Sequence, residues 1–87
     1  MAIENRYDIK TRINEYYGKM SKGQKAISAF IYDHYDQAVF MTAAKLGDTV
    51  GVSESTVVRY AMFIGYNGYP EFQRDLEYWV QNKINSV

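Results

Sequence analysis

The sequence predicts an all-α fold, a bundle of five helices with no β wing. Apolar residues recur at helical spacing in several separate stretches, and hydroxyl residues or proline stand at the starts of most of them. Glycines stand where three of these stretches end, and no strand-like alternation of apolar and polar residues stands out over the 87 residues. A chain of this length suits one small domain, 1–87.

Two helices are expected before residue 36. The first, from about Asp8 to Tyr17, carries an apolar stripe and is predicted to end at Gly18. The second begins at Ser21, which forms an S-x-x-Q capping box with Gln24, and it is predicted to end near Tyr35. One face of this second helix is lined by Ile27, Phe30, Ile31 and His34.

Residues 42–65 are predicted to form two short helices around a corner. Thr42 caps the first helix, which spans about 43–50. Gly51 follows it, where the chain must take a left-handed backbone that glycine adopts without a Cβ penalty. The second helix then spans about 54–64.

Two further residues fit a tight corner. Gly47 faces the second helix, where any larger side chain would hold the two helices apart. Ser53 has a hydroxyl that can accept a hydrogen bond from the free amides that open the second helix. The whole stretch 42–65 is therefore predicted to be a helix-turn-helix.

The remaining segments are expected to complete the bundle. Residues 36–41 form a short connector of about one turn, and Gly65 ends the second helix of the corner. Pro70 opens the fifth helix at its first position, where a missing amide hydrogen costs nothing. Leu76 and Trp79 are expected to pack across the helix-turn-helix and the first two helices.

Composition argues against several classes of function. The chain has no cysteine and one histidine, His34, with no set of three or four convergent metal ligands. No catalytic arrangement or phosphate-binding loop is visible, so we expect neither an enzyme nor a cofactor. No apolar run could span a bilayer and the N-terminus does not resemble a signal peptide, so a cytoplasmic protein is expected.

The second helix of the corner carries the functional hypothesis. If its apolar residues face inward, Ser55 and Arg59 face outward and Thr56 lies on the flank. Small hydroxyl residues let the helix approach the floor of a DNA groove, and Arg59 can reach a guanine edge. We therefore expect these three residues to contact bases. Contacts to phosphates are expected from Thr42, Lys45, Ser53, Tyr66 and Asn67.

Other interpretations stay open. Ser53 can be a cap and nothing more, Lys45 can be a solvated lysine, and Arg59 can pair with Glu54 or Asp75. Ten Lys plus Arg balance ten Asp plus Glu, and a net charge of zero counts mildly against nucleic-acid binding.

The same corner could instead dock a protein through Met62, Phe63 and exposed tyrosines. The tyrosines that suit a homodimer surface are Tyr7, Tyr32, Tyr35 and Tyr78, whereas Tyr60 and one of Tyr16 and Tyr17 are expected in the core.

The chain resembles the N-terminal DNA-binding domain of RpiR-type bacterial transcriptional regulators. The resemblance covers nearly all of the chain after Ile9, including the upstream helix that begins at Ser21. The pattern is a threonine-capped helix, then G-V-S-x-x-T-V-x-R, an aromatic residue and G-[YF]-x-G-[YF]-x-x-F. The matching residues are Gly51, Val52, Ser53, Thr56, Val57, Arg59, Tyr60, Gly65, Tyr66, Gly68, Tyr69 and Phe72.

This resemblance implies a regulator of sugar catabolism genes that binds a DNA operator as a homodimer or higher oligomer. It also implies a phosphosugar effector, bound by a C-terminal sugar-isomerase-type domain that this sequence does not contain. Two departures stand out. The stretch 61–63 lacks the basic residue that the family often has there, and Gly47 stands where alanine is usual.

Overall fold

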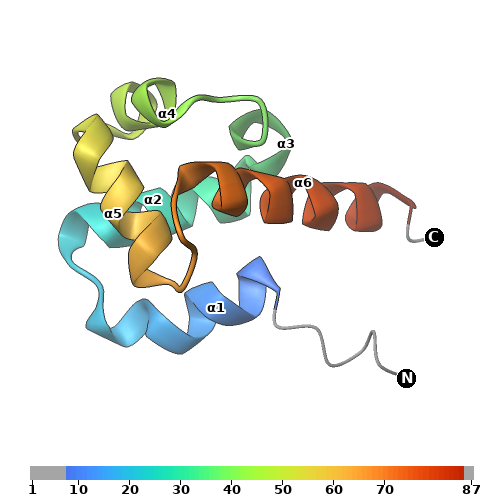
Figure 1. Cartoon of the computed structure of the whole chain (residues 1–87), viewed down its shortest axis with the longest axis horizontal. Coiled ribbons are helices and arrows are strands. Elements are labelled where there is room, and N and C mark those ends of the chain that lie inside the picture. Colours follow the sequence, from blue (N-terminus) through green and yellow to red (C-terminus); the bar gives the residue numbers. More distant parts are fainter. Residues whose placement is uncertain (1–7, 86–87) are drawn as a thin grey trace.

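The computed structural model describes residues 8–85 and shows the all-α fold that the sequence predicts (Figure 1). The part described contains no strand. Where five helices and a connector were expected, it contains six α-helices and one 3₁₀ turn. The elements are α1 Ile9–Tyr16, η2 Tyr17–Lys19, α2 Lys22–Asp33, α3 Tyr35–Ala38, α4 Ala43–Val50, α5 Glu54–Phe63 and α6 Tyr69–Asn85.

The sixth helix is α3, a single turn inside the predicted connector. It forms because His34 leaves the helical conformation, with φ −139° and ψ 42°, while its carbonyl accepts bonds from the next turn. The amides of Gln37 and Ala38 donate to the His34 carbonyl oxygen at 3.0 and 2.9 Å. Four residues are too few for a helical face to show in the sequence pattern, which is why the prediction stopped at a connector.

The first helix also ends differently from the prediction. It ends at Tyr16, and Gly18 lies inside the 3₁₀ turn η2 that follows. Among the described residues only Gly51 and Gly65 have a positive φ. Gly18 therefore does not stop the helix through a left-handed conformation. By contrast, the predicted capping box is confirmed, because the Ser21 amide donates to Gln24 Oε1 at 2.9 Å and the Gln24 amide to Ser21 Oγ at 3.2 Å.

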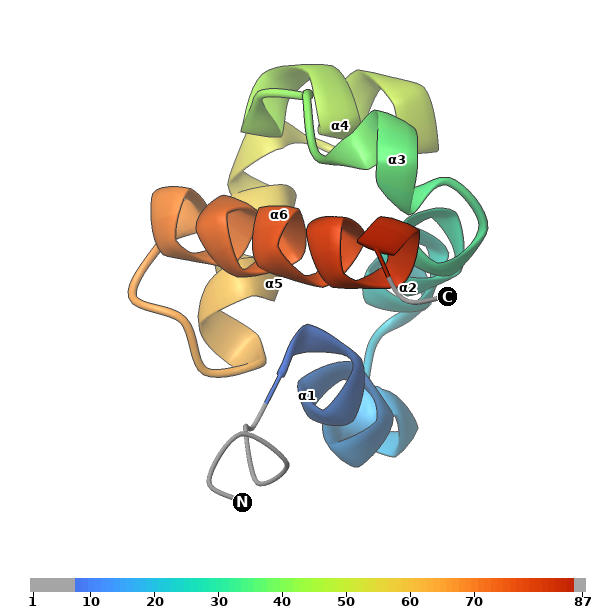
Figure 2. The same cartoon turned by 90° about the vertical axis from the view of Figure 1, so that its right-hand side faces the viewer.

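The core lies where α5 and α6 cross, with α1 and α2 packed around them. Figure 2 shows α6 between α4 at the top and α1 at the bottom. Tyr60 of α5 and Phe72 of α6 are the two largest fully buried side chains. Their rings pack edge to face, with 6.0 Å between the ring centres. Leu76 is also fully buried, as its predicted packing role requires. The apolar stripes predicted for the helices thus meet in one core.

One buried hydroxyl pair lies inside this core. The Tyr60 hydroxyl and the Ser28 hydroxyl are 2.8 Å apart, and Ser28 Oγ also contacts the sulfur of Met20 at 3.1 Å. Burial raises the pKa of Tyr60 well above its usual range, so the hydroxyl stays protonated and can keep its hydrogen bond. Tyr60 is therefore a core residue, as predicted, and it ties α5 to α2.

The other tyrosines lie in several environments. Tyr32 and Tyr35 are half-buried, because both pack on Trp79. The centre of the Trp79 ring lies 6.5 Å from that of Tyr32 and 5.1 Å from that of Tyr35. Trp79 thus packs over α2 and α3. Tyr16 is half-buried against Phe63, whereas Tyr17 and Tyr78 are exposed; Tyr7 lies outside the described residues.

Arg12 joins α1 to the far end of α5. Its Nη1 donates to the Ile64 carbonyl oxygen at 3.1 Å, and its guanidinium lies 4.3 Å from the centre of the Tyr66 ring. A cation at a helix C-terminus is stabilising because the last carbonyl groups carry partial negative charge. The left-handed Gly65 beside it leaves room for the guanidinium, since a Cβ there would overlap the arginine.

We expect Arg12→Met to lower the free energy of unfolding by ~1–2 kcal/mol, because a charge-assisted hydrogen bond and a cation–π contact are lost together. Urea unfolding followed by circular dichroism measures this change. Lys10→Met is the matched control, since Lys10 is exposed on the same helix. Equal stability of the two variants would show that the Arg12 contacts contribute nothing.

Candidate nucleic-acid interface

The corner between α4 and α5 forms as predicted. Gly51 is left-handed, with φ 95°, and its amide donates to the Gly47 carbonyl oxygen at 2.8 Å. The Val52 amide donates to the same oxygen at 2.9 Å. A Cβ on Gly47 would lie 2.7 Å from the Val52 carbonyl oxygen, a distance that real Cβ atoms do not reach. The absence of a side chain at Gly47 is therefore what lets the turn before α5 pack this closely on α4.

The orientation of α5 also matches the prediction. Its inward residues are buried, and the opposite side is open to solvent (Figure 1, yellow to orange). Ser55 and Arg59 are exposed, Met62 is 54% exposed, and Thr56 and Val58 are half-buried. The buried residues are Val57, Tyr60, Ala61 and Ile64.

Three hydroxyl groups meet at the start of α5. Ser53 Oγ accepts a hydrogen bond from the Thr56 amide at 3.1 Å, so Ser53 is the N-cap. The same oxygen lies 2.9 Å from Thr56 Oγ1 and 3.3 Å from Ser55 Oγ. These groups are close to a free helix terminus, where hydroxyls and amides suit a phosphate or a base edge. Of the predicted base-contacting hydroxyls, that of Ser55 is the more accessible.

Arg59 stands one turn further along the same face. Within the described residues its guanidinium has no hydrogen-bond or ion-pair partner, so the alternative pairing with Glu54 or Asp75 is not formed. Arg59 lines a shallow open hollow with Ser53, Glu54, Ser55 and Val58. Val58, which is not among the predicted site residues, also lines this hollow, and its methyl groups suit contact with a thymine methyl.

The start of α4 offers two more polar groups beside α5. Thr42 Oγ1 accepts a hydrogen bond from the Lys45 amide at 3.0 Å, which confirms the predicted cap. Both side chains are exposed, and the Lys45 ammonium has no partner among the described residues. A phosphate group fits such a place, since the amides at a helix N-terminus point outward and favour negative charge.

The turn after α5 differs from the arrangement that the sequence suggested. Tyr66 is 5% exposed and its hydroxyl donates to Asp75, so the ring belongs to the core. The backbone amide of Asn67, another of the predicted phosphate contacts, donates to Glu71 Oε1 at 2.7 Å. The hydroxyl and the amide are thus used inside the domain, and a carboxylate stands beside them. A phosphate contact here stays a prediction, and the Asn67 side chain is exposed.

Two further features of the described residues bear on other classes of function. Residues 8–85 hold no group of three or more histidine, cysteine or carboxylate side chains arranged to bind a metal ion. His34, the single histidine considered as a metal ligand, is exposed. Its ring packs on Phe30, with 4.9 Å between the ring centres. None of the described helices has the length and apolar character needed to cross a membrane.

An all-α bundle with an uncovered second helix at a glycine corner defines the class of helix-turn-helix domains. The chain belongs to the rpiR family of these domains, because the sequence model of the rpiR-family helix-turn-helix domain matches residues 7–83. The resemblance drawn from Gly51, Ser53 and Arg59 is thereby confirmed.

Several curated relatives carry the same kind of name. An uncharacterized HTH-type transcriptional regulator of Providencia stuartii, in the aarA 3′ region, is 35% identical over 52 residues, which are 60% of this chain and 18% of that protein. The uncharacterized regulator YfhH of Escherichia coli is 30% identical over 59 residues, 68% of this chain and 21% of that protein. The Clostridium perfringens regulator CPE0189 is 26% identical over 68 residues, 78% of this chain and 24% of that protein. The chain thus spans about a fifth to a quarter of the length of these relatives, and no solved structure matches it.

Proposed function

We propose that this domain binds double-stranded DNA sequence-specifically as part of a bacterial transcriptional regulator, with α5 in the major groove. The observation that supports this most directly is the open face of α5 in a helix-turn-helix of the rpiR family. Ser55 and Arg59 lie one turn apart on this face, and Arg59 has no partner in the part of the chain that the structure describes. Helix-turn-helix domains place the N-terminal residues of this second helix against base edges.

The residues divide into two roles. Arg59 binds a guanine edge through two parallel hydrogen bonds, and Ser55 and Thr56 contact neighbouring bases. Thr42 and Lys45, at the start of the adjacent helix, hold the phosphate backbone, and Ser53 supports them from the α5 cap. Asn67 is a further phosphate contact, with Tyr66 supporting the turn from the core.

Selection of bound sequences from a random duplex pool tests the proposal. We expect recovery of a sequence with two related half-sites, because symmetric operators mirror the twofold symmetry of the proteins that read them. Recovery of a pool as random as the starting material would contradict sequence-specific binding.

Salt dependence tests the role of Lys45. We expect affinity to fall as salt rises, and Lys45→Gln to weaken binding similarly on all sequences and to reduce the log–log salt slope by about 1, since one phosphate contact is lost. Fluorescence anisotropy titrations at several salt concentrations measure both effects. Lys10→Gln removes one exposed charge from α1 and should leave the slope unchanged. A slope that Lys45→Gln does not alter would remove the phosphate contact from this lysine.

A protein-interaction module is the second candidate. Met62 is 54% exposed near the C-terminal end of α5, and the net charge of the chain is zero. Both features suit an apolar protein partner better than DNA. The two candidates separate cleanly, because a protein complex held by Met62 would be insensitive to salt and would not form with duplex DNA.

The finer parts of the proposal come from the family alone. We propose that the regulated genes serve sugar catabolism and that a phosphosugar acts through a C-terminal sugar-isomerase-type domain of the whole regulator. A regulator that binds bacterial chromosomal DNA would work in the cytoplasm. Expression of a reporter gene from a promoter that carries the selected operator, measured during growth on different sugars, tests the proposed link to sugar catabolism.

A further inference from the structure

Phe40 is the most exposed large hydrophobic residue of the part described. Its side chain is 87% exposed, compared with 54% for Met62 and 42% for Tyr17. Leaving a phenylalanine in water forgoes the hydrophobic stabilisation that a buried ring would contribute. An exposed residue of this size needs an explanation when it stands next to a hollow in the surface, as Phe40 does.

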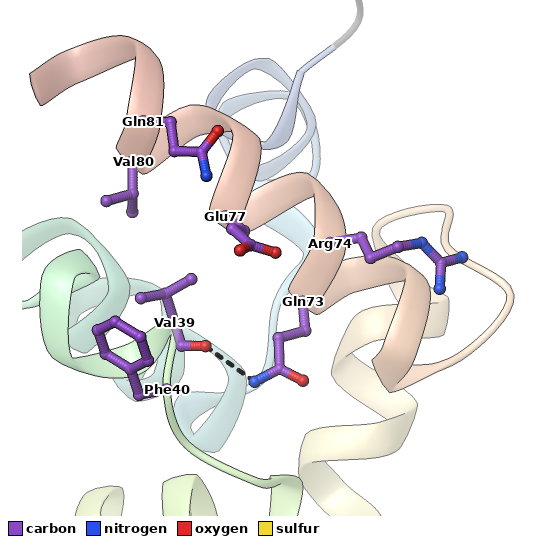
Figure 3. Close-up of a pocket in the computed structure, with 7 residues that line it drawn as sticks. All are labelled: Val39, Phe40, Gln73, Arg74, Glu77, Val80 and Gln81. Carbon is purple, nitrogen blue, oxygen red and sulfur yellow. Dashed lines mark hydrogen bonds between the residues drawn. The ribbon is translucent and has the colours of Figure 1, made fainter. Parts of the chain in front are cut away.

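The backbone on either side of Phe40 is held by hydrogen bonds from α6. Gln73 Nε2 donates to the Val39 carbonyl oxygen at 2.9 Å (Figure 3) and to the Met41 carbonyl oxygen at 3.0 Å, on either side of Phe40. The Tyr69 hydroxyl donates to the Met41 carbonyl oxygen at 2.8 Å, and burial raises the pKa of Tyr69 to about 12, so it stays a donor. Two side chains of α6 thus hold the turn that presents Phe40.

A hollow lies between Phe40 and α6. Figure 3 shows the Phe40 ring on one side and α6 on the other, with Val39 and Val80 among the residues that line it. Both valines are 7% exposed, so they form an apolar lining rather than a free surface. The volume of about 350 Å³ exceeds the ~150 Å³ that holds a benzene molecule in an engineered protein cavity. The hollow therefore has room for a phenylalanine ring beside Phe40.

Charges of both signs stand on the same stretch of α6. Arg74 and Glu77 line the hollow and are exposed, one turn apart. When two copies of one surface meet across a twofold axis, every contact occurs twice. If residue i of the first copy contacts residue j of the second, residue j of the first copy contacts residue i of the second. An antiparallel meeting of two α6 helices would bring Arg74 of each copy to Glu77 of the other. The surface thus carries both charges that a twofold pairing with a second copy needs.

We propose that this Phe40 face, made of Phe40, Val39, Arg74, Glu77 and Val80, binds a second copy of the chain. Each copy inserts its Phe40 ring into the hollow of the other, and Arg74 pairs with Glu77 across the twofold axis. The tyrosines expected from the sequence are less suited, since Tyr32 and Tyr35 already pack on Trp79. The inference extends the proposed function, because a helix-turn-helix that reads a symmetric operator needs two copies.

Sedimentation equilibrium of the 87-residue chain without DNA tests this inference. We expect a monomer–dimer equilibrium in which Phe40→Gln raises the dissociation constant ~10-fold or more, as loss of a central aromatic residue does at interfaces. Met62→Gln is the matched control, since it removes the other strongly exposed apolar side chain and should leave the constant unchanged. Circular dichroism verifies that both variants are folded. A chain that stays monomeric up to about 1 mM, or a Phe40→Gln variant that dimerises like Met62→Gln, would overturn the inference.

Charge reversal tests the pairing itself. Arg74→Glu and Glu77→Arg should each weaken the homodimer, because like charges then face each other. A mixture of the two variants should form a heterodimer tighter than either homodimer, and the double variant should regain the native affinity. Equal affinities for all mixtures would exclude the Arg74–Glu77 pair. Since DNA is absent throughout, a monomeric chain that binds DNA overturns only this inference, whereas a dimer that fails to bind DNA overturns only the proposed function.

Discussion

Replacing Arg59 with alanine is expected to weaken binding to the selected duplex by ~1–3 kcal/mol while binding to unrelated duplexes changes much less. The reason is geometric. The Arg59 guanidinium is exposed on the open face of α5 and has no partner within residues 8–85, so its donors are available to a guanine edge. Loss of a bidentate contact removes discrimination at one base pair, whereas loss of a phosphate contact would affect every sequence alike.

Anisotropy titrations with the selected duplex and with a scrambled duplex measure this difference. Lys10→Ala is the charge-matched control, because it also removes one exposed positive charge but lies on α1. If Arg59→Ala and Lys10→Ala had the same small effect on both duplexes, Arg59 would not read a base. If Arg59→Ala weakened both duplexes equally, Arg59 would be a phosphate contact.

Gly47→Val is expected to lower the free energy of unfolding by about 3 kcal/mol, a large share of the stability of a domain this size. A Cβ at this position would lie 2.7 Å from the Val52 carbonyl oxygen and 3.2 Å from the Ser53 carbonyl group. These are backbone atoms of the corner, so they cannot move aside as the tip of a flexible side chain would. Either the corner opens or the domain loses α4 packing.

Urea or thermal unfolding measures this loss. Ala44→Val is the matched control, since Ala44 is exposed on the same helix and the change costs only the helix propensity of valine, about 0.6 kcal/mol. Because opening the corner would also shift α4 against α5, DNA affinity should fall with stability. A Gly47→Val variant as stable as Ala44→Val would show that the corner relaxes without cost.

The corner was predictable because its rules are local. Thr42 caps an amide three residues away, and Ser53 does the same for Thr56. Glycine is needed at position 51 because the backbone of that one residue is left-handed. Such requirements appear in the sequence as fixed spacings, and the helical period then decides which side of α5 is buried.

Long-range contacts were not predictable in the same way. Arg12 bonds to a carbonyl group 52 residues away, and nothing in its own neighbourhood marks it for that role. Tyr66 was assigned to a phosphate from its place in a turn, but Asp75 accepts its hydrogen bond from the next helix. Phe40 lies in a segment too short to show a period, so its exposure became visible only in three dimensions. Local patterns fix the elements, whereas tertiary packing decides which polar groups remain available.

The bond between Arg12 and Ile64 bears on how small a working version of this domain can be made. The corner and the helix behind it are complete from Ser21 onward, and a chain trimmed to that point would look sufficient on paper. Such a trimmed chain would lose the side chain that closes the last turn of α5. Grafting the corner into another scaffold would therefore call for a substitute cation at the same carbonyl group.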